Sequence, residues 1–86
     1  MKIIKFHQDS CQPCRMVESF LSDVLKVEVD ESYNVWDNDR VTLEMVQNYM
    51  IMQTPVILLI DDEYKEIGKS VGFKPSELEN LFSKRG

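Results

Sequence analysis

The chain has few of the features that would place it in a membrane, on nucleic acid or outside the cell. No run approaches the roughly 18 consecutive apolar residues of a membrane span, and the apolar stretch at residues 1–5 is too short for a signal peptide. Acidic residues outnumber basic ones by 15 to 10, the net charge is −5, and basic residues cluster only at Lys84 and Arg85. This balance argues against nucleic acid or anionic lipid as the partner. We therefore expect a cytoplasmic protein that binds neither nucleic acid nor membranes.

Cysteine and histidine are also scarce, with Cys11, Cys14 and His7 as the only examples. These residues cannot complete a four-ligand zinc or iron–sulfur site unless two chains share their ligands. A disulfide that closes a four-residue loop would remove only about 2 kcal/mol of chain entropy, a weak reason to keep a structural bridge. In a reducing compartment, a close cysteine pair is typical of catalysis or metal binding. A redox pair is favoured, while a structural bridge and a shared metal site stay open.

The length of 86 residues predicts a single domain over residues 1–86 with room for one site. Apolar residues make up 43% and charged residues 29%, which is an ordinary globular balance and predicts that the chain folds. No internal repeat or low-complexity segment is present.

The first third of the chain predicts a strand, a helix and a second strand. Residues 2–6 are short and β-prone, and a polar loop follows them. From Pro13 the apolar residues recur with helical spacing as far as Val24, and Ser10 is the expected N-cap. Cys11 would then lie at the helix N-terminus. Residues 25–30 alternate between apolar and charged side chains, which is typical of a strand with one buried face.

The rest of the chain predicts a helix, a hairpin and a final helix. Residues 41–50 have a helical pattern that would bury Leu43, Val46 and Met50, with Asp37 or Asp39 as the N-cap. The apolar run at residues 56–60 fits a central strand buried on both faces, and a turn at 61–63 leads into a strand at 64–69. Gly72 ends that strand, and Ser76 would cap a closing helix. The expected fold is α/β, β-α-β-α-β-β-α, with a four-stranded mixed sheet flanked by three helices.

Disulfide exchange requires a thiolate, and the expected position of Cys11 favours one. The unpaired N–H groups at a helix N-terminus stabilise an anion, and Arg15 adds positive charge nearby. We expect Cys11 to attack a substrate disulfide and Cys14 to resolve the mixed disulfide. Proline at the start of a central strand favours a cis peptide bond, so Thr54 and Pro55 would form a shelf for the substrate.

With these motifs the chain resembles the thioredoxin/glutaredoxin superfamily over almost its whole length. The resemblance rests on Phe6 followed by Cys11-Gln12-Pro13-Cys14, on Val27 to Asp30, on Tyr49, Ile51 and Thr54-Pro55-Val56, and on Val71-Gly72-Phe73. It implies a thioredoxin fold and a disulfide reductase with Cys11 as nucleophile and Cys14 as buried resolving thiol. The substrate-binding residues would be Gln12, Pro13, Thr54, Pro55 and Gly72.

Two positions depart from the thioredoxin pattern. Ser10 stands where a tryptophan is usual, and Lys5 stands where thioredoxins bury the aspartate that handles the proton of the second cysteine. Lys5 would either favour a Cys14 thiolate or turn to solvent, and His7 is a candidate proton relay because imidazole titrates near neutrality.

The resemblance also implies a monomer with no bound cofactor and no metal, supplied with electrons by an NADPH-dependent flavoprotein of the thioredoxin-reductase type. Glutathione is the alternative reductant, since Gly72 and Ser76 offer part of a site for it. Disulfide-containing proteins would be the substrates, with ribonucleotide reductase among the possible clients. The competing classes are a redox-inactive interaction domain and a metal-binding dimer. The segment Tyr33 to Arg40 is longer than usual, with Trp36 expected to pack, and Met45, Met50 and Met52 are expected to fill core gaps.

Overall fold

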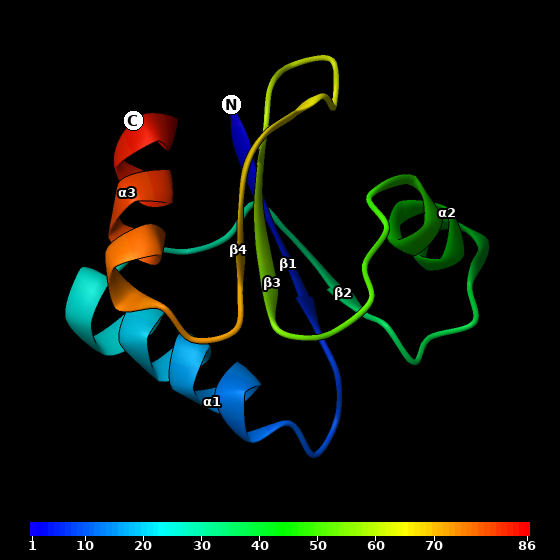
Figure 1. Ribbon diagram of the computed structural model, residues 1–86, viewed down its shortest axis with the longest axis horizontal. Coiled ribbons are helices and arrows are strands. Elements are labelled where there is room, and N and C mark those ends of the chain that lie inside the picture. The colour runs from blue at the N-terminus through cyan, green and yellow to red at the C-terminus, as the bar shows by residue number, and fades with distance from the viewer.

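A four-stranded mixed sheet forms the centre of the molecule in the computed structural model, which describes all 86 residues (Figure 1). The strand order is β2-β1-β3-β4, with β1 parallel to β2 and antiparallel to β3, and β3 antiparallel to β4. The predicted order of elements is confirmed. The elements are β1 (Lys2–His7), α1 (Gln12–Ser19), a π-helix η1 (Phe20–Leu25), β2 (Glu31–Asn34), α2 (Arg40–Asn48), β3 (Val56–Ile60), β4 (Glu66–Val71) and α3 (Pro75–Arg85).

Helices cover both faces of the sheet, and each face has its own hydrophobic core. Strand β3 is buried at every position, as the apolar run predicted, because α1, η1 and α3 pack on one face and α2 on the other (Figure 1). The first core consists of Ile3, Val17, Leu21, Ile57, Leu59, Leu78, Leu81 and Phe82. The second consists of Ile4, Phe6, Met45, Val56, Leu58 and Ile60.

Helix α1 has Cys11 itself as its N-cap, so the prediction of Ser10 was wrong. Cys11 has extended backbone angles, and its side chain accepts the hydrogen bond that a cap accepts. Ser10 has a positive φ of 54°, which belongs to the preceding turn rather than to a cap. Pro13 lies in the first turn, where its missing N–H costs nothing.

The second strand occupies residues 31–34 and not the predicted 25–30. Leu25 completes η1, and Lys26 ends that helix in the left-handed conformation with φ 55°. Val27 and Val29 pack against the first core but form no ladder with β1. The parallel pairing starts only where Ile4 lies opposite Glu31. The alternation of apolar and charged residues at 25–30 therefore reflects a half-buried segment and not a paired strand.

Of the residues predicted to face the sheet from α2, only Val46 packs against the second core. It begins after Asp39, which accepts the Thr42 N–H at 3.1 Å and the Thr42 hydroxyl at 2.8 Å. The capping role of Asp39 is confirmed. Thr42 and Met45 are the buried positions, whereas Leu43 is exposed. The hydroxyl partner explains how a polar threonine occupies the inner face.

The methionine prediction holds for one residue only. Met45 is buried, but Met50 and Met52 are 73% and 86% exposed. Met50 has a positive φ of 52°, so the chain turns away from the sheet after α2 and carries both side chains to the surface.

The last strand begins later than predicted, and the last helix begins earlier. The Asp61 carboxylate accepts the N–H groups of Glu63 and Lys65 at 2.8 and 2.9 Å, which extends the turn and delays β4 to Glu66. Helix α3 has Lys74 as its N-cap, so Ser76 lies inside the helix and does not cap it. Pro75 at the first position explains this start, because its fixed φ suits N1.

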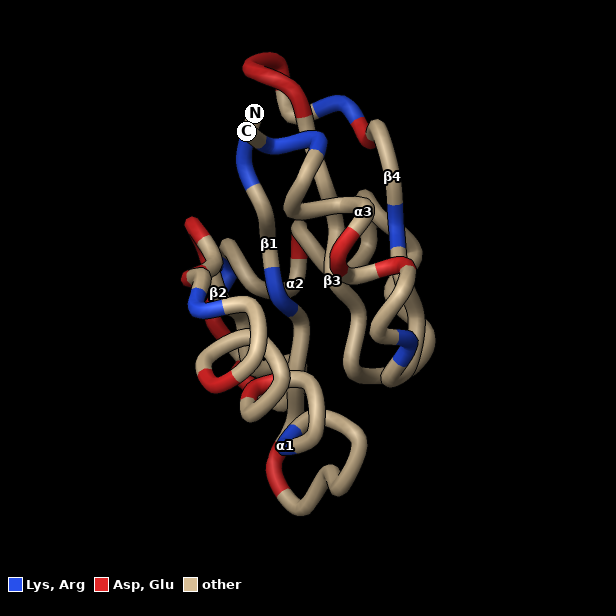
Figure 2. Tube along the Cα trace, turned by 90° about the vertical axis from the view of Figure 1, so that its left-hand side faces the viewer, with Lys and Arg blue, Asp and Glu red and all other residues tan.

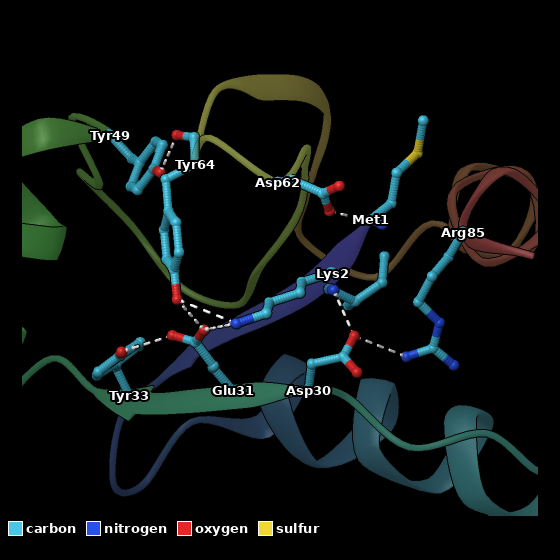
Figure 3. A network of polar contacts seen from close by, with 10 residues as sticks. Met1, Lys2, Asp30, Glu31, Tyr33, Tyr49, Asp62, Tyr64 and Arg85 are labelled. Atoms are coloured by element: carbon cyan, nitrogen blue, oxygen red, sulfur yellow. Dashed lines mark hydrogen bonds and ion pairs between the residues drawn. The ribbon is translucent and has the colours of Figure 1, made fainter.

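A polar network joins the hairpin turn to β2 at the end of the sheet where β1 begins (Figure 3). Glu31 accepts hydrogen bonds from the hydroxyls of Tyr33 at 2.7 Å and Tyr64 at 2.5 Å and from the Lys2 ammonium at 3.4 Å. The Tyr49 hydroxyl donates to the Tyr64 carbonyl, which ties the end of α2 to the same turn.

Basic residues are spread along the trace rather than gathered in one segment (Figure 2). No helix of the structure is both long and apolar enough to cross a membrane.

Candidate redox site

The two cysteines lie where the chain passes from β1 into α1, at the lower end of the sheet in Figure 1. Cys11 and Cys14 are joined by a disulfide, and the chain has no free cysteine. Both are buried, with exposed fractions of 7% and 4%. The disulfide therefore lies just beneath the surface, and a partner that reaches it must contact the residues around it.

The sulfur of Cys11 occupies the place that a serine or aspartate oxygen takes at other helix N-termini. Its Sγ accepts the N–H of Cys14 at 3.2 Å, and the Cys11 carbonyl accepts the N–H of Arg15 at 3.3 Å. The N–H groups of a first helical turn have no partner within the helix and carry the positive end of the helix dipole. The same groups will stabilise negative charge on Cys11 once the disulfide is reduced.

The segment before β3 reaches the same sulfur from a distant part of the chain. The Thr54–Pro55 peptide bond is cis, as predicted. Thr54 Oγ1 lies 3.7 Å from Cys11 Sγ, and because the bonded sulfur carries no hydrogen, the hydroxyl is the donor. The fold thus brings Thr54 and Pro55 to the cysteines as the sequence predicted.

Gly72 completes this side of the site. Its N–H donates to the Pro55 carbonyl at 2.9 Å, which links the end of β4 to the segment before β3. Its φ of +82° is one that side-chain-bearing residues rarely adopt. A Cβ at this position would meet no atom within 4 Å, so there is open space at Gly72, next to the segment before β3.

An ion pair joins β1 to the last turn of α1. Lys5 is largely buried, and its Nζ lies 3.0 Å from Glu18 Oε1, so its ammonium is paired with a carboxylate of α1. Burial lowers the pKa of His7, and the neighbouring Lys5 ammonium lowers it further. Both effects favour the neutral form of the His7 imidazole.

Sequence reasoning missed Glu18, although a signal was present. Glu18 follows Cys14 by four residues, so both side chains belong to neighbouring positions on one side of α1. Gln12, Pro13 and Arg15, the other predicted site residues, lie on the exposed surface of the first turn.

A groove of about 420 Å³ leads away from the redox motif along α1 and was also missed from the sequence. The rings of Phe20 and Phe73 meet edge to face in it, with centroids 5.8 Å apart. The signal was a second apolar series at spacing four, Met16, Phe20 and Val24, beside the buried stripe. The full lining is Gln12, Arg15, Met16, Ser19, Phe20, Asp23, Val24 and Phe73.

Two further features bear on the sequence predictions. Trp36 is 57% exposed, so the expectation that it packs was wrong. Asn34 explains this, because it accepts the Trp36 N–H at 3.0 Å and donates to Asp9 at 3.2 Å, which fixes the loop at the sheet edge. No group of three or more histidine, cysteine or acidic side chains is arranged to hold a metal ion.

Comparison with known proteins gives close and distant matches. The chain is 35% identical to the SPbeta prophage-derived thioredoxin-like protein YosR of Bacillus subtilis over 94% of each chain. Reduced thioredoxin pre-protein from Schistosoma mansoni matches 95% of this chain and 75% of its own, with a TM-score of 0.72 and 19% identity. Fasciola hepatica thioredoxin matches 98% of this chain and 79% of its own, with a TM-score of 0.70 and 23% identity. No family model matches the sequence.

Proposed function

Because this chain belongs to the thioredoxin/glutaredoxin superfamily and carries a Cys11–Cys14 disulfide, we propose that it reduces disulfide bonds in proteins. The thioredoxin-like fold and the cysteine pair support the broader class of thiol–disulfide oxidoreductases. The observation that carries the proposal is the position of Cys11 Sγ, which receives the Cys14 N–H at 3.2 Å and the Thr54 hydroxyl at 3.7 Å. A nucleophilic thiolate needs such donors.

In the first step, the thiolate of reduced Cys11 attacks one sulfur of the substrate disulfide. A Cys11–substrate disulfide forms, the substrate S–S bond breaks, and the departing substrate sulfur takes a proton. Cys11 is the attacking residue in this proposal because its sulfur is at the helix N-terminus, whereas the Cys14 side chain is the more deeply buried of the two.

In the second step, Cys14 loses its proton and attacks Cys11 Sγ. The second substrate sulfur leaves and is protonated, and the Cys11–Cys14 bond seen in the structure is restored. Two electrons and two protons have then moved from the protein to the substrate. Our candidate for accepting the Cys14 proton is His7, the one histidine of the chain, because imidazole titrates near neutrality. Lys5, two residues before it on β1, is paired with Glu18.

The substrate backbone would lie across Thr54, Pro55 and Gly72. The linked position of Pro55 and Gly72 and the open space at the glycine support this placement. Gln12 and Pro13, exposed between the cysteines, would contact the substrate from the opposite side. Arg15 has no ion-pair partner and adds positive charge near the thiolate.

Trapping experiments test the assignment of the two cysteines. A Cys14→Ser variant mixed with a disulfide-containing protein is expected to accumulate a mixed disulfide through Cys11, visible by mass spectrometry. A Cys11→Ser variant is expected to accumulate none. Accumulation in Cys11→Ser alone would reverse the roles. Catalysis of insulin reduction by the wild type no faster than dithiothreitol alone would favour a redox-inactive interaction domain, and stoichiometric metal in the purified protein would favour a metal-binding dimer.

We propose a flavoprotein of the thioredoxin-reductase type as the electron source. Phe73 follows Gly72 directly, and Ser76 lies within α3 and does not cap it, so the groups that would hold glutathione are incomplete. Recycling by NADPH and thioredoxin reductase should therefore exceed recycling by NADPH, glutathione and glutathione reductase. The reverse order of rates would assign the protein to the glutathione-dependent branch.

A further inference from the structure

The groove along α1 begins within the redox motif and continues away from it. Gln12, between the two cysteines, lines one end, and Val24, on η1, lines the other. Phe73, directly after Gly72, forms part of its wall. A polypeptide bonded to Cys11 and lying over Gly72 would therefore reach this groove with its next residues.

The groove exposes apolar side chains to water, and this exposure does not stabilise the monomer. Met16 is 43% exposed and Val24 is 62% exposed, and they flank the edge-to-face pair of Phe20 and Phe73. Side chains of this kind at the rim of a concave surface favour burial by a partner.

The two ends of the groove carry opposite charges. Arg15 lies near the redox motif, Asp23 lies near the far end, and neither takes part in an ion pair. Asp23 accepts only the hydroxyl of Ser22, at 3.2 Å. Arg15 on α1 and Asp23 on η1 are eight helical residues apart, an axial rise of roughly 12 Å, which corresponds to roughly four residues of extended chain.

We propose that this groove binds the extended segment next to the reactive cysteine of a protein substrate. The segment carries an acidic residue beside the cysteine, a basic residue about four positions further on, and apolar residues between them. This proposal rests on the proposed function, and it deepens it by stating which disulfides the protein selects. The acidic residue pairs with Arg15, the basic residue with Asp23, and the apolar residues cover Met16 and Val24.

A second copy of the chain is the competing occupant. Its net charge of −5 opposes association with itself. Two copies related by a two-fold axis would also place helix against helix over the groove instead of filling the space between α1 and Phe73. The opposite end charges instead fit a linear segment with a defined direction.

Two synthetic peptides of equal composition test the proposal. Each has a terminal cysteine in a mixed disulfide with 5-thio-2-nitrobenzoate, followed by apolar residues and two charges. One peptide has the acidic residue beside the cysteine and a lysine four positions on, and the other has the two exchanged. Attack of reduced Cys11 on the peptide sulfur releases the coloured thiol. We expect the first peptide to react about fivefold faster, since each exposed ion pair contributes about 0.5 kcal/mol or less and two pairs are reversed between the peptides.

Variants at the far end of the groove sharpen the test. Asp23→Lys is expected to remove the preference, because each peptide then makes one attractive and one repulsive charge contact. Val24→Ser is expected to slow the first peptide about threefold through lost apolar contact. Val41→Ser is the matched control, because Val41 is an exposed helical valine on α2, outside the groove. It should leave both rates unchanged.

The outcomes separate this proposal from the function beneath it. Release from neither peptide faster than by free glutathione would overturn the proposed function, and the groove proposal with it. Fast release from both at equal rates, or equal effects of Val24→Ser and Val41→Ser, would overturn the groove proposal alone. A dimer in sedimentation velocity that Val24→Ser dissociates would overturn it in favour of a second copy.

Discussion

Thr54 is the residue outside the cysteine motif that contacts Cys11 Sγ most directly. Its hydroxyl donates to that sulfur across 3.7 Å. After reduction this donor stabilises the thiolate, so Thr54→Val should leave less of Cys11 ionised at neutral pH. A hydrogen bond to a charged group contributes about 1.5 kcal/mol, so the ionised fraction of Cys11 should fall roughly tenfold. The remaining thiolate is more basic and therefore more nucleophilic, which restores roughly half of this loss on a logarithmic scale. We expect alkylation of reduced Cys11 by iodoacetamide at pH 7 to slow about threefold.

Thr54→Ser is the matched control for this prediction, because it keeps the hydroxyl and removes only a methyl group. Its alkylation rate should stay close to that of the wild type. Equal slowing in Thr54→Ser and Thr54→Val would mean that packing, and not the hydrogen bond, controls the reactivity of Cys11.

Ser70 has a buried hydroxyl without a hydrogen-bond partner. It is 1% exposed, and it lies opposite Ile57 on the face of the sheet that α1 and α3 cover. Burying an unpaired hydroxyl costs about 1 to 3 kcal/mol, so Ser70→Ala should raise the free energy of unfolding by about 1 kcal/mol after the loss of packing around the oxygen. Urea denaturation of the oxidised protein measures this change. Ser83→Ala, at an exposed position of α3, should change stability little, and a destabilised Ser70→Ala would show that the hydroxyl has a partner in solution.

Single residues were predictable from sequence when they belong to a contiguous motif. The Cys11–Cys14 pair, Thr54 and Pro55 were identified in this way, and the structure brings them together. Glu18 was not identified, because its spacing from Cys14 does not reveal that its partner is Lys5, which lies on another element. A pairing of this kind depends on which face of α1 lies over β1, and that is decided by packing.

At the scale of elements, the sequence predicted those whose pattern has a single interpretation. The run of apolar residues in β3 and the helical spacing in α1 are of this type. The alternation at residues 25–30 is not, because a half-buried segment beside a helix end gives the same period as a paired strand. The position of β2 is fixed by the left-handed Lys26 and by hydrogen bonding to β1, neither of which is visible in hydrophobicity.

The start of α2 gives an element-scale prediction. The Asp39 carboxylate accepts the N–H and hydroxyl of Thr42, and the Thr42 N–H, as the largest cause, holds the pKa of Asp39 below its ordinary value. Asp39→Ala should lower the melting temperature by about 5 °C, the typical consequence of a lost N-cap in a small domain. Asp37→Ala is the control, because Asp39 and not Asp37 caps α2, and it should melt within about 1 °C of the wild type.

The sign of the pH dependence distinguishes capping from a general effect of charge. A carboxyl whose pKa is lowered in the folded state stabilises the protein above its unfolded pKa of about 3.9, and that contribution is lost as the pH falls through the folded value. The difference in melting temperature between wild type and Asp39→Ala should therefore shrink below pH 4. A difference that stays constant down to pH 2.5 would contradict the capping role.

The whole molecule places redox chemistry and structural polar contacts at opposite ends of one strand. The cysteines follow the carboxyl end of β1, whereas Lys2, at its amino end, joins the network around Glu31 (Figure 3). That network connects β2 to the hairpin turn and, through Tyr49, to α2. The order of elements predicted the sheet, but this network was not predictable because its members lie far apart in sequence.

Tyr33 makes the contribution of this network measurable at alkaline pH. Burial raises the pKa of Tyr33 to about 12, and its hydrogen bond to Glu31 adds to the effect. The neutral phenol is thus favoured in the folded state, so its stabilisation is complete below the unfolded pKa of about 10 and is lost as the pH rises from 10 to 12. Tyr33→Phe should cost about 1 kcal/mol at pH 8 while keeping the stacking on Phe6.

The test compares the unfolding free energies of the wild type and Tyr33→Phe across a range of pH. Urea denaturation of the oxidised proteins at pH 8, 9, 10, 11 and 11.5 should show a constant difference in unfolding free energy up to pH 9 and a shrinking one above pH 10. Lys2 and Tyr49, whose pKa values are also raised, destabilise both proteins in the same window and cancel in the difference. A difference that persists unchanged at pH 11.5 would mean that the Tyr33 hydroxyl does not hold its proton through Glu31, and the network would then stabilise this end of the sheet by packing alone.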